Sequence, residues 1–511
     1  MLVKIYGSAI FGVSAQTITI EVNIDTGGVG YHLVGLPDNA IKESSYRISA
    51  ALKNVGYKIP GKKITINMAP ADLRKEGSSY DLSIAIGILV ASGQIKGDHT
   101  QDYIIMGELS LDGSLQPIRG VLPIAIQARE EGFKGIILPK QNTREAAIVN
   151  NLDVYGVENI KEVIDFFNEG KELERVVLDT RKEFQDKINN FPFDFSEVKG
   201  QETAKRAMEV AAAGGHNIIL IGPPGSGKTM LAKRVPSILP PLTLKEALET
   251  TKIHSVAGKM GTETSLMTVR PFRSPHHTIS DVALVGGGSY PQPGEISLAH
   301  NGVLFLDEMP EFKRTVLEVM RQPLEDREVT ISRARFTVNY PSSFMLVASM
   351  NPSPSGYFPD DPNNTSSVFE MQRYMNKLSG PLLDRIDIHV EVQKVEFEQL
   401  AEKRKGEKSE DIRKRVLKAR EIQNQRYDNL SISYNAQIGP KELEQFCELD
   451  DASFNLIKMA MEKLNLSARA YDRILKVART IADLEGSENI TSTHISEAIQ
   501  YRSLDREFWN V

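Results

Sequence analysis

The chain has 511 residues, of which 41% are hydrophobic and 25% are charged, and its formal net charge is −6. This length exceeds what one hydrophobic core supports, and the negative charge excludes a general attraction to nucleic acid, so any such binding needs local basic clusters. No apolar run is long enough to span a bilayer, no signal peptide is evident, and the one cysteine, Cys447, is typical of a reducing compartment; we therefore expect a cytoplasmic protein without a membrane partner.

Four regions follow one another along the chain. Residues 1–170 mix predicted strands with short helices, and residues 171–194 are charged and weakly apolar, which is typical of a linker. Residues 195–393 alternate apolar strands with helices, as in an α/β domain with a parallel sheet. Residues 394–511 are helical in pattern, so we expect a separate helical domain there.

The strongest motif follows the apolar strand predicted at 217–221. A glycine-rich turn there leads into a helix, which is the context that a phosphate-binding loop requires. Its backbone N–H groups would face phosphate oxygens, its lysine would reach the β- and γ-phosphates, and its threonine hydroxyl would bind Mg²⁺. The predicted nucleotide contacts are Gly222, Pro223, Pro224, Gly225, Ser226, Gly227, Lys228, Thr229 and Met230.

Two further predicted strands end in polar residues that would complete this site. The strand at 302–308 ends in Asp307 and Glu308, and the strand at 343–351 ends in Asn351. Strands of a parallel sheet place their chemistry at the carboxyl edge. Asp307 would support Mg²⁺, Glu308 would polarise the attacking water and Asn351 would orient water against the γ-phosphate, so the motifs together predict ATP and Mg²⁺ as cofactors.

Four segments of this sequence resemble the ComM/YifB family of AAA+ ATPases, which is related to the magnesium-chelatase motor subunit. They are residues 195–234, 270–288 (RPFRSPHHTISDVALVGGG), 293–312 and 378–392 (LSGPLLDRIDIHVEV). The resemblance extends over essentially the whole chain and implies an α/β AAA+ P-loop core with a helical lid, preceded by a Lon-protease-like α+β domain.

The resemblance also implies an activity. We expect an ATP-driven hexameric ring that acts on single-stranded or branched DNA, as a branch-migration helicase in recombination or DNA uptake. The alternative is a protein-remodelling or metal-insertion ATPase closer to the chelatase motor. The Lon-like domain favours the first reading, because chelatase motors lack it.

The same resemblance carries over several site residues. Arg385, in LLDRID, matches the arginine finger that a neighbouring protomer inserts against the γ-phosphate. Arg469, in LSARAYDR, matches the second sensor of the lid, with Arg473 as the alternative. Val198 and Gly200 match the segment that lies near adenine.

Two segments are expected to contact DNA. The sequence REVTISRARFTVNYPSS predicts a hairpin with Arg333 and Arg335 near its tip, which would contact phosphates without sequence preference. An exposed hairpin whose basic residues discourage edge pairing is an equally good interpretation. Arg273 and His277 lie in the segment that resembles a pore loop.

Residues 106–142 and the segment around Ser79 resemble the Lon protease fold. Ser79 occupies the position of the nucleophile or a position beside it. A serine nucleophile needs a base, and Leu122 stands where the Lon family has its lysine. We therefore expect this domain to be catalytically inactive.

The loop after Asn351 departs from the family. Many members carry four cysteines there that resemble a zinc knuckle, and this chain has a serine or an asparagine at each of the four positions: Ser353, Ser355, Asn364 and Ser366. Hydroxyl and amide groups do not replace thiolates on zinc. The sequence therefore predicts no zinc.

Overall fold

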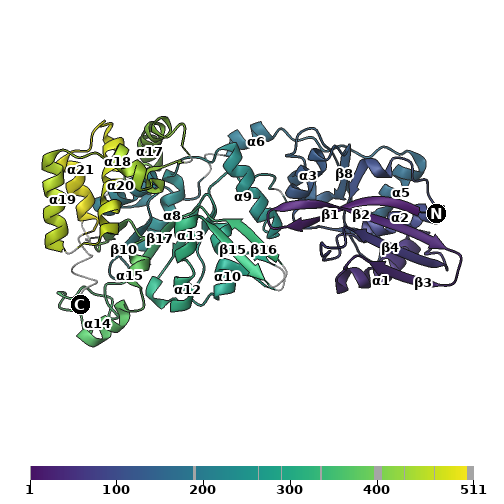
Figure 1. Cartoon of the computed structure of the whole chain (residues 1–511), viewed down its shortest axis with the longest axis horizontal. Coiled ribbons are helices and arrows are strands. Elements are labelled where there is room, and N and C mark those ends of the chain that lie inside the picture. The colour runs from purple at the N-terminus through teal and green to yellow at the C-terminus, as the bar shows by residue number, and fades with distance from the viewer. Residues whose placement is uncertain are drawn as a thin grey trace. The chain divides into compact units, whose positions relative to one another are not determined.

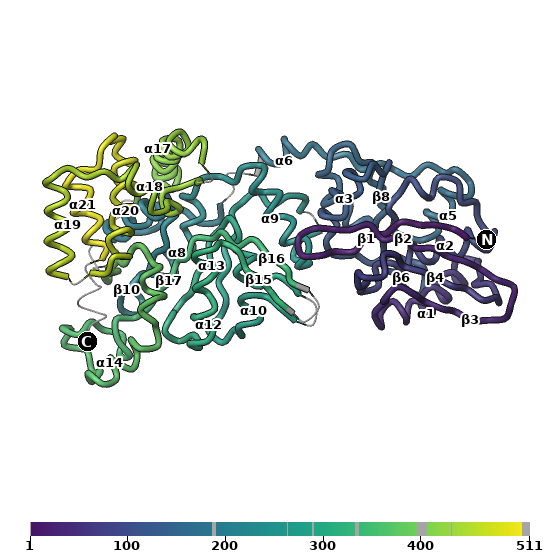
Figure 2. The backbone as a smooth tube through the Cα atoms, in the orientation of Figure 1, coloured from purple at the N-terminus to yellow at the C-terminus, as the bar shows by residue number. Residues whose placement is uncertain are grey.

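The computed structural model describes residues 2–187, 191–262, 264–288, 291–333, 336–395, 406–430, 432–464 and 466–502 (Figures 1 and 2). The chain divides into two compact units. Unit 1 holds residues 1–187 and 244–267, and unit 2 holds residues 188–243 and 268–511. No helix of the described residues combines the length and the apolar character needed to cross a membrane.

Unit 1 is built on a mixed sheet whose strands lie in the order β3-β4-β2-β1-β5-β8-β9. The strands are β1 (Leu2–Phe11), β2 (Ser14–Asp25), β3 (Gly30–Val34), β4 (Lys63–Ala69), β5 (Tyr103–Ile105), β8 (Gly135–Pro139) and β9 (Asp153–Val157). Helix α2 (Asp81–Ala91) is buried along its whole length because nearly all of its residues are small or apolar, and it packs against β1 and β2.

Helix α9 (Leu244–Val256) belongs to unit 1, although its residues fall within the range 195–393 that the sequence predicts as the α/β core. It packs against α3 (Val121–Glu130), and the backbone N–H of Gly120 donates to the carbonyl of Ser255 over 3.0 Å. Its residues Ile253 and Val256 are buried. Unit 1 is therefore assembled from two separate stretches of the chain.

Unit 2 is built on a five-stranded sheet in the order β11-β14-β17-β10-β18, in which all paired strands are parallel. Its strands are β11 (Phe272–Arg273), β14 (Val303–Leu306), β17 (Met345–Met350), β10 (Ile218–Ile221) and β18 (Ile388–Glu391). Every residue of β10, β14 and β17 is buried, which explains why these strands are runs of apolar residues without polar alternation. The predicted parallel sheet is confirmed.

Helices α7 (Glu202–Gly214) and α8 (Lys228–Ile238) pack near this sheet, and β15 (Glu328–Arg333) pairs with β16 (Phe336–Pro341) as the predicted hairpin. The other described helices and strands of the two units are α1 (Asn39–Asn54), β6 (Glu108–Leu109), β7 (Leu115–Gln116), α4 (Thr143–Ala146), α5 (Ile160–Glu169), α6 (Thr180–Lys187), α10 (Asp281–Val285), β12 (Gly286–Gly287), β13 (Gln292–Pro293), α11 (Glu295–Leu298), α12 (Arg314–Glu318), α13 (Arg321–Asp326), α14 (Val368–Met375) and α15 (Gly380–Leu383).

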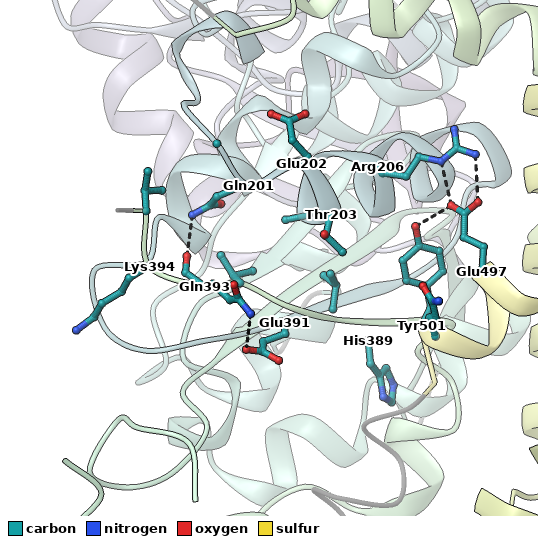
Figure 3. A pocket seen from close by; sticks show the side chains of 16 residues that line it. Gln201, Glu202, Thr203, Arg206, His389, Glu391, Gln393, Lys394, Glu497 and Tyr501 are labelled. Carbon is teal, nitrogen blue, oxygen red and sulfur yellow. Dashed lines mark hydrogen bonds and ion pairs between the residues drawn. The ribbon is translucent and has the colours of Figure 1, made fainter. Parts of the chain in front are cut away.

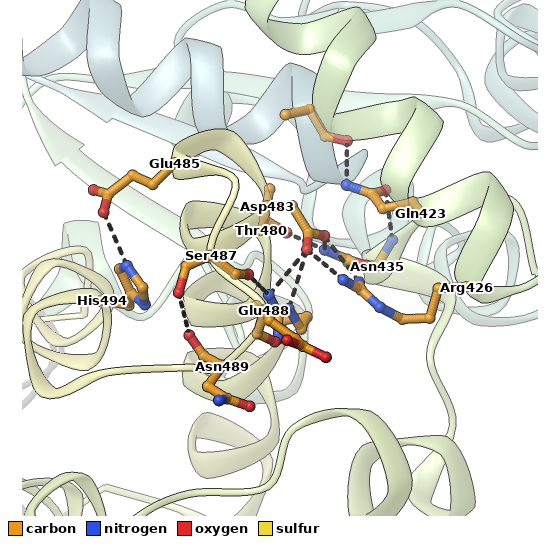
Figure 4. Close-up of polar contacts among 12 residues, drawn as sticks. Gln423, Arg426, Asn435, Thr480, Asp483, Glu485, Ser487, Glu488, Asn489 and His494 are labelled. Atoms are coloured by element: carbon orange, nitrogen blue, oxygen red, sulfur yellow. Dashed lines mark hydrogen bonds and ion pairs between the residues drawn. The ribbon is translucent and has the colours of Figure 1, made fainter.

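The helical region predicted after the sheet is also present. It comprises α17 (Ser409–Arg426), α18 (Pro440–Phe446), α19 (Asp451–Leu464), α20 (Ala468–Glu485) and α21 (Ser492–Gln500). Helices α17 and α20 meet through a polar core, in which the buried Asp483 accepts from Arg426 over 2.9 Å, Arg479 over 3.1 Å and Asn435 over 2.8 Å (Figure 4). These contacts fix the two helices against each other because each buried charge has its counter-charge nearby.

Candidate nucleotide site

The phosphate loop is the turn between β10 and α8. Gly227 precedes α8 with φ +90° and Gly225 has φ +75°, conformations that side-chain-bearing residues rarely adopt. Gly222 lies so close to the neighbouring backbone that a Cβ there would stand 2.1 Å from the carbonyl oxygen of Val392. The glycines of the motif are thus required by the turn itself, which begins the helix with its N–H groups directed to an anion site.

Lys228 is buried at the start of α8. Its Nζ donates to the carbonyl of Gly222 over 2.6 Å, to the carbonyl of Pro223 over 3.0 Å and to Asn351 Oδ1 over 3.2 Å. Burial lowers the pKa of Lys228, and the carboxylates of Asp307 and Glu308 oppose that shift. The ammonium therefore bridges the phosphate loop and the end of β17.

Asp307 follows β14 at the carboxyl edge of the sheet. Its Oδ2 accepts from the Thr229 hydroxyl over 2.8 Å, and its Oδ1 accepts from the Ser349 hydroxyl. Ser349 is fully buried and is a residue that the sequence analysis missed. A serine in an otherwise apolar strand was the available signal: because Leu306 pairs with Ala348, the next residues, Asp307 and Ser349, lie side by side.

Glu308 and Asn351 complete this edge. Glu308 has φ +52°, a left-handed conformation uncommon for glutamate, and its N–H donates to Ser349 Oγ over 3.1 Å. The carbonyl of Asn351 accepts from the Tyr374 hydroxyl over 3.3 Å. The polar ends of three strands, predicted separately, thus meet at the phosphate loop.

These groups fit a magnesium nucleotide. The Thr229 hydroxyl and the Asp307 carboxylate are neighbouring oxygen ligands of the kind that Mg²⁺ prefers. The buried ammonium of Lys228 and the N-terminus of α8 supply positive charge to a triphosphate. The geometry is that of a site for phosphoryl transfer.

A cavity of about 780 Å³ lies beyond the phosphate loop, between the start of α7, the residues from His389 to Val395, and the end of α21 (Figure 3). Gly200 lines it, and Gln201 Nε2 donates to the carbonyls of Ser226 in the loop and Gln393. Val198 is fully buried in the core of unit 2, and Met230 packs against that core. Of the predicted adenine segment, Gly200 is the residue that reaches the cavity.

The predicted arginines lie at the other edge of the sheet. The backbone carbonyl of Arg385 accepts from Asn217 Nδ2 over 3.2 Å, immediately before β10 begins, whereas the phosphate loop follows the end of β10. Arg473 pairs with Asp387 over 2.9 Å and Arg469 approaches Asp384 at 3.8 Å, both near this amino edge. From Asn217 to Gly222 the chain advances by five residues at about 3.3 Å each, so the two edges are roughly 17 Å apart.

The predicted DNA contacts are only partly described. Arg333 ends β15 and pairs with Phe336 at the tip of the hairpin, and Arg335 lies outside the described residues. Arg273 forms two hydrogen bonds to Glu295, over 2.6 and 2.7 Å. The ring of His277 lies 4.1 Å from that of His276.

The four residues at the cysteine positions form one hydrogen-bonded cluster. Ser355 Oγ donates to Asn364 Oδ1 over 2.8 Å and lies 2.9 Å from Ser353 Oγ, while Ser366 Oγ accepts from the N–H of Ser355 over 3.0 Å. The structure shows no cluster of three or more metal-binding histidine, cysteine or acidic side chains in the part of the chain that it describes. Side-chain hydrogen bonds therefore join the two ends of this loop.

In unit 1, the position of the missing base is filled by apolar packing. Leu122 is fully buried in α3, and its backbone N–H donates to Glu145 Oε1 over 3.0 Å. The carbonyl of Ser79 accepts from the N–H of Gly107 over 2.8 Å. The structure thus leaves the expectation of an inactive protease fold standing as a prediction.

Comparisons with known proteins cover both units. Models of the magnesium chelatase subunit ChlI match residues 20–142 and 194–400, and a model of its C-terminal part matches residues 406–502. Competence protein ComM of Haemophilus influenzae is 45% identical over 510 residues, 99% of this chain and 98% of that protein. YifB of Escherichia coli, described as uncharacterized, is 44% identical over 503 residues, 98% of this chain and 97% of that protein.

A more distant similarity concerns the protease-like part. Lon protease 2 of Bacillus subtilis is 29% identical over 179 residues, 31% of this chain and 32% of that protein. Together with the full-length matches and the nucleotide-site geometry, this fixes the family. The chain belongs to the ComM/YifB family of magnesium-chelatase-like AAA+ ATPases, with Lon protease homology in its N-terminal part.

Proposed function

We propose that this ATPase works as a hexameric ring that moves on branched or single-stranded DNA, as a branch-migration helicase in recombination or DNA uptake. The observation that carries the proposal is the separation of Arg385 from the phosphate loop of its own sheet. An arginine at the amino edge cannot stabilise phosphate charge at the carboxyl edge of the same protomer. The site that it could complete is therefore that of a neighbouring protomer.

The position of Arg469 and Arg473 supports the same arrangement. Both lie near Asp384 and Asp387, beside Arg385, so three guanidinium groups are offered at one edge. A triphosphate bound at the carboxyl edge of a second protomer is an anion that this group would stabilise. Each active site would then combine Lys228, Asp307 and Glu308 of one chain with arginines of the next.

DNA as the substrate rests on the hairpin of β15 and β16 and on the similarity to a competence protein. The hairpin carries Arg333 at its tip. Contacts from the tip to DNA phosphates would not depend on the DNA sequence. The match to a magnesium chelatase subunit favours the other candidate, a protein-remodelling or metal-insertion ATPase.

The test is ATP hydrolysis with and without forked DNA, together with migration of a four-way junction. We expect forked DNA to stimulate ATP hydrolysis. We expect the four-way junction to migrate only when ATP is present. If DNA does not stimulate ATP hydrolysis and the junction does not migrate, the chelatase-type activity becomes the better hypothesis.

The shared site has its own test. The Arg385→Ala protomer has an intact Glu308 in its own site but cannot supply an arginine to its neighbour. The Glu308→Gln protomer can supply the arginine but lacks the carboxylate in its own site. Each variant alone should hydrolyse ATP at least about a hundredfold more slowly, and mixing them should recover part of the activity. Mixtures that stay as inactive as the separate variants would contradict a site shared between protomers.

A further inference from the structure

Arg385 is covered by its own chain. Only 7% of its side chain is exposed; its Nη1 donates to the carbonyl of Pro381 over 2.5 Å, and its Nη2 pairs with the carboxylate of Glu325. Its Nε is buried and has no hydrogen-bond partner among the described residues. The guanidinium is thus held in place, and its charge is already matched by an anion.

Glu325 is the outer partner of this pair. It lies on α13 with 51% of its side chain exposed, whereas Arg385 is almost entirely enclosed, so the carboxylate covers the guanidinium from the solvent side. The hydrogen bond from Arg385 lowers the pKa of Glu325; partial burial opposes this shift, and the charges of Arg385, Arg469 and Arg473 add to it. The carboxylate therefore remains ionised at neutral pH.

A carboxylate and a phosphate bind the same donors of an arginine. The guanidinium keeps unused N–H groups, so the competition does not come from a shortage of donors. It comes from access and charge: only 7% of the Arg385 side chain is exposed, and a phosphate that approached it would meet the negative charge of the Glu325 carboxylate. We infer that Glu325 masks Arg385 in the separate protomer, and that the triphosphate in a neighbour's site must displace this carboxylate before the arginine can act.

This inference rests on the proposed function, in which Arg385 completes the site of a neighbour. Masking makes assembly and turnover compete with an internal ion pair. It predicts that half-maximal ATP hydrolysis per protomer requires a higher protein concentration than it would without the ion pair. Glu325 is then a residue that acts through Arg385 and does not touch the nucleotide.

The experiment measures ATP hydrolysis per protomer as a function of protein concentration for the wild type and for Glu325→Gln. The amide keeps the size of the side chain but removes its charge. We expect the half-maximal concentration to fall by about twofold to fivefold, the range for losing one partly exposed charged contact, while turnover at saturation stays unchanged. Sedimentation with a non-hydrolysable ATP analogue should show the same shift in assembly.

Two variants make the result specific. Glu318→Gln removes a comparable exposed carboxylate, which pairs with Arg321 over 3.0 Å, and should leave the midpoint unchanged. In the Arg385→Ala background, Glu325→Gln should no longer shift assembly, because the arginine that it masks is gone. A shift that persists there would show that Glu325 acts on something else and would overturn the inference.

The remaining outcomes separate the inference from the function on which it rests. If Glu325→Gln leaves the half-maximal protein concentration unchanged, masking is wrong. If it lowers ATP turnover at saturating protein by more than about tenfold, masking is also wrong, and Glu325 orients the arginine instead. If wild-type turnover is independent of concentration and Arg385→Ala is fully active, the shared site itself is wrong and masking fails with it.

Discussion

At the scale of single residues, the nucleotide site assigns different tasks to Lys228 and Glu308. The ammonium of Lys228 is buried between the phosphate loop and Asn351, where it holds the loop together as well as offering charge to a phosphate. Glu308 has a left-handed backbone that is held by Ser349. Binding and hydrolysis should therefore be separable by mutation.

We expect Lys228→Ala to lose ATP binding, because it removes the buried charge that faces the phosphates. Glu308→Gln should bind ATP normally and hydrolyse it at least about a hundredfold more slowly, because an amide cannot accept the proton of the attacking water. Titration with a fluorescent ATP analogue and phosphate release measure the two steps. Wild-type turnover by Glu308→Gln would assign the base to another residue.

A second residue-scale prediction concerns His216, which is fully buried beside β10. Its Nε2 lies 2.8 Å from Thr480 Oγ1 and its Nδ1 lies 3.4 Å from Asp387 Oδ2. Burial lowers the pKa of His216, although Asp387 opposes the shift, so the folded protein keeps the imidazole neutral while the unfolded chain protonates it near pH 6.5. Its contribution to stability is therefore complete above that pH and is lost as the pH falls through it.

We expect the free energy of unfolding to decrease between pH 7 and pH 5, and His216→Gln to make this slope smaller. His276→Gln, which changes an exposed histidine, should leave the slope unchanged. Asp387 does not titrate in this window: burial alone would raise its pKa, but Arg473 and His216 outweigh burial and hold that pKa well below its usual value. Denaturant unfolding at several pH values measures the slopes, and equal slopes for the wild type and His216→Gln would contradict the prediction.

At the scale of elements, helices α17 and α20 depend on a buried charge cluster. Asp483 is fully enclosed between Arg426 and Arg479. Removing its carboxylate would leave two largely buried guanidinium groups without their anion. These two helices therefore should not tolerate the loss of Asp483.

We expect Asp483→Ala to destabilise unit 2 by about 3–5 kcal/mol, the usual consequence of breaking a buried pair from one side. The matched control is Glu485→Gln two residues on, where the glutamate is 52% exposed and pairs with His494 over 3.0 Å. Its effect should stay below about 1 kcal/mol. Denaturant unfolding followed by circular dichroism distinguishes them, and similar losses would show that burial of Asp483 is not the cause.

The loop after Asn351 is the other element whose support is unusual. Its side-chain cluster joins Ser353 and Ser355 to Asn364 and Ser366, and Gly356 lies so close to the phosphate loop that a Cβ there would approach Pro224 Cδ to 2.8 Å. Hydrogen bonds join the side chains of Ser353, Ser355 and Asn364, and the Ser366 hydroxyl accepts from the backbone N–H of Ser355. The four residues therefore lie close together, but their chemistry does not suit zinc.

We expect no stoichiometric zinc in the purified protein and no effect of chelators other than the removal of Mg²⁺. Replacing all four residues by cysteine should create a site for one zinc ion, because four thiolates would then surround one point. Metal analysis by mass spectrometry checks both. Zinc bound to the wild type would contradict the assignment, and a four-cysteine variant that binds none would show that the positions do not converge closely enough.

Much of unit 2 follows from sequence because short apolar strands with polar ends identify a parallel sheet and its active edge. Gly222, Lys228, Asp307 and Asn351 are found this way. Ser349 escapes such reasoning because its role depends on the register between β14 and β17. The pairing of Arg385 with Glu325 is equally hidden, since 60 residues separate the two and no local pattern connects them.

At the scale of the whole molecule, the path of the chain was beyond prediction. Helix α9 follows the phosphate-loop helix in sequence, yet it completes unit 1, where Ser255 accepts from the N–H of Gly120. Periodicity identifies a helix but not the unit against which it packs. The chain consequently passes from one unit to the other three times.

A fragment of residues 1–187 should therefore be less stable than unit 1 in the full chain. It lacks α9, whose buried Ile253 and Val256 each contribute about 1.5–3 kcal/mol. A fragment in which residues 244–267 follow residue 187 through a flexible linker should recover this stability. Thermal unfolding compares the two, and identical transitions would mean that α9 is dispensable for unit 1.

The opposite placement of the phosphate loop and Arg385 on one sheet also governs the geometry of assembly. In the proposed ring, each interface joins the carboxyl edge of one protomer to the amino edge of the next and is therefore heterologous. In an open chain of such contacts the last nucleotide always lacks its arginine, and only a closed circle completes every site. Turnover per protomer would then report whether the circle is closed.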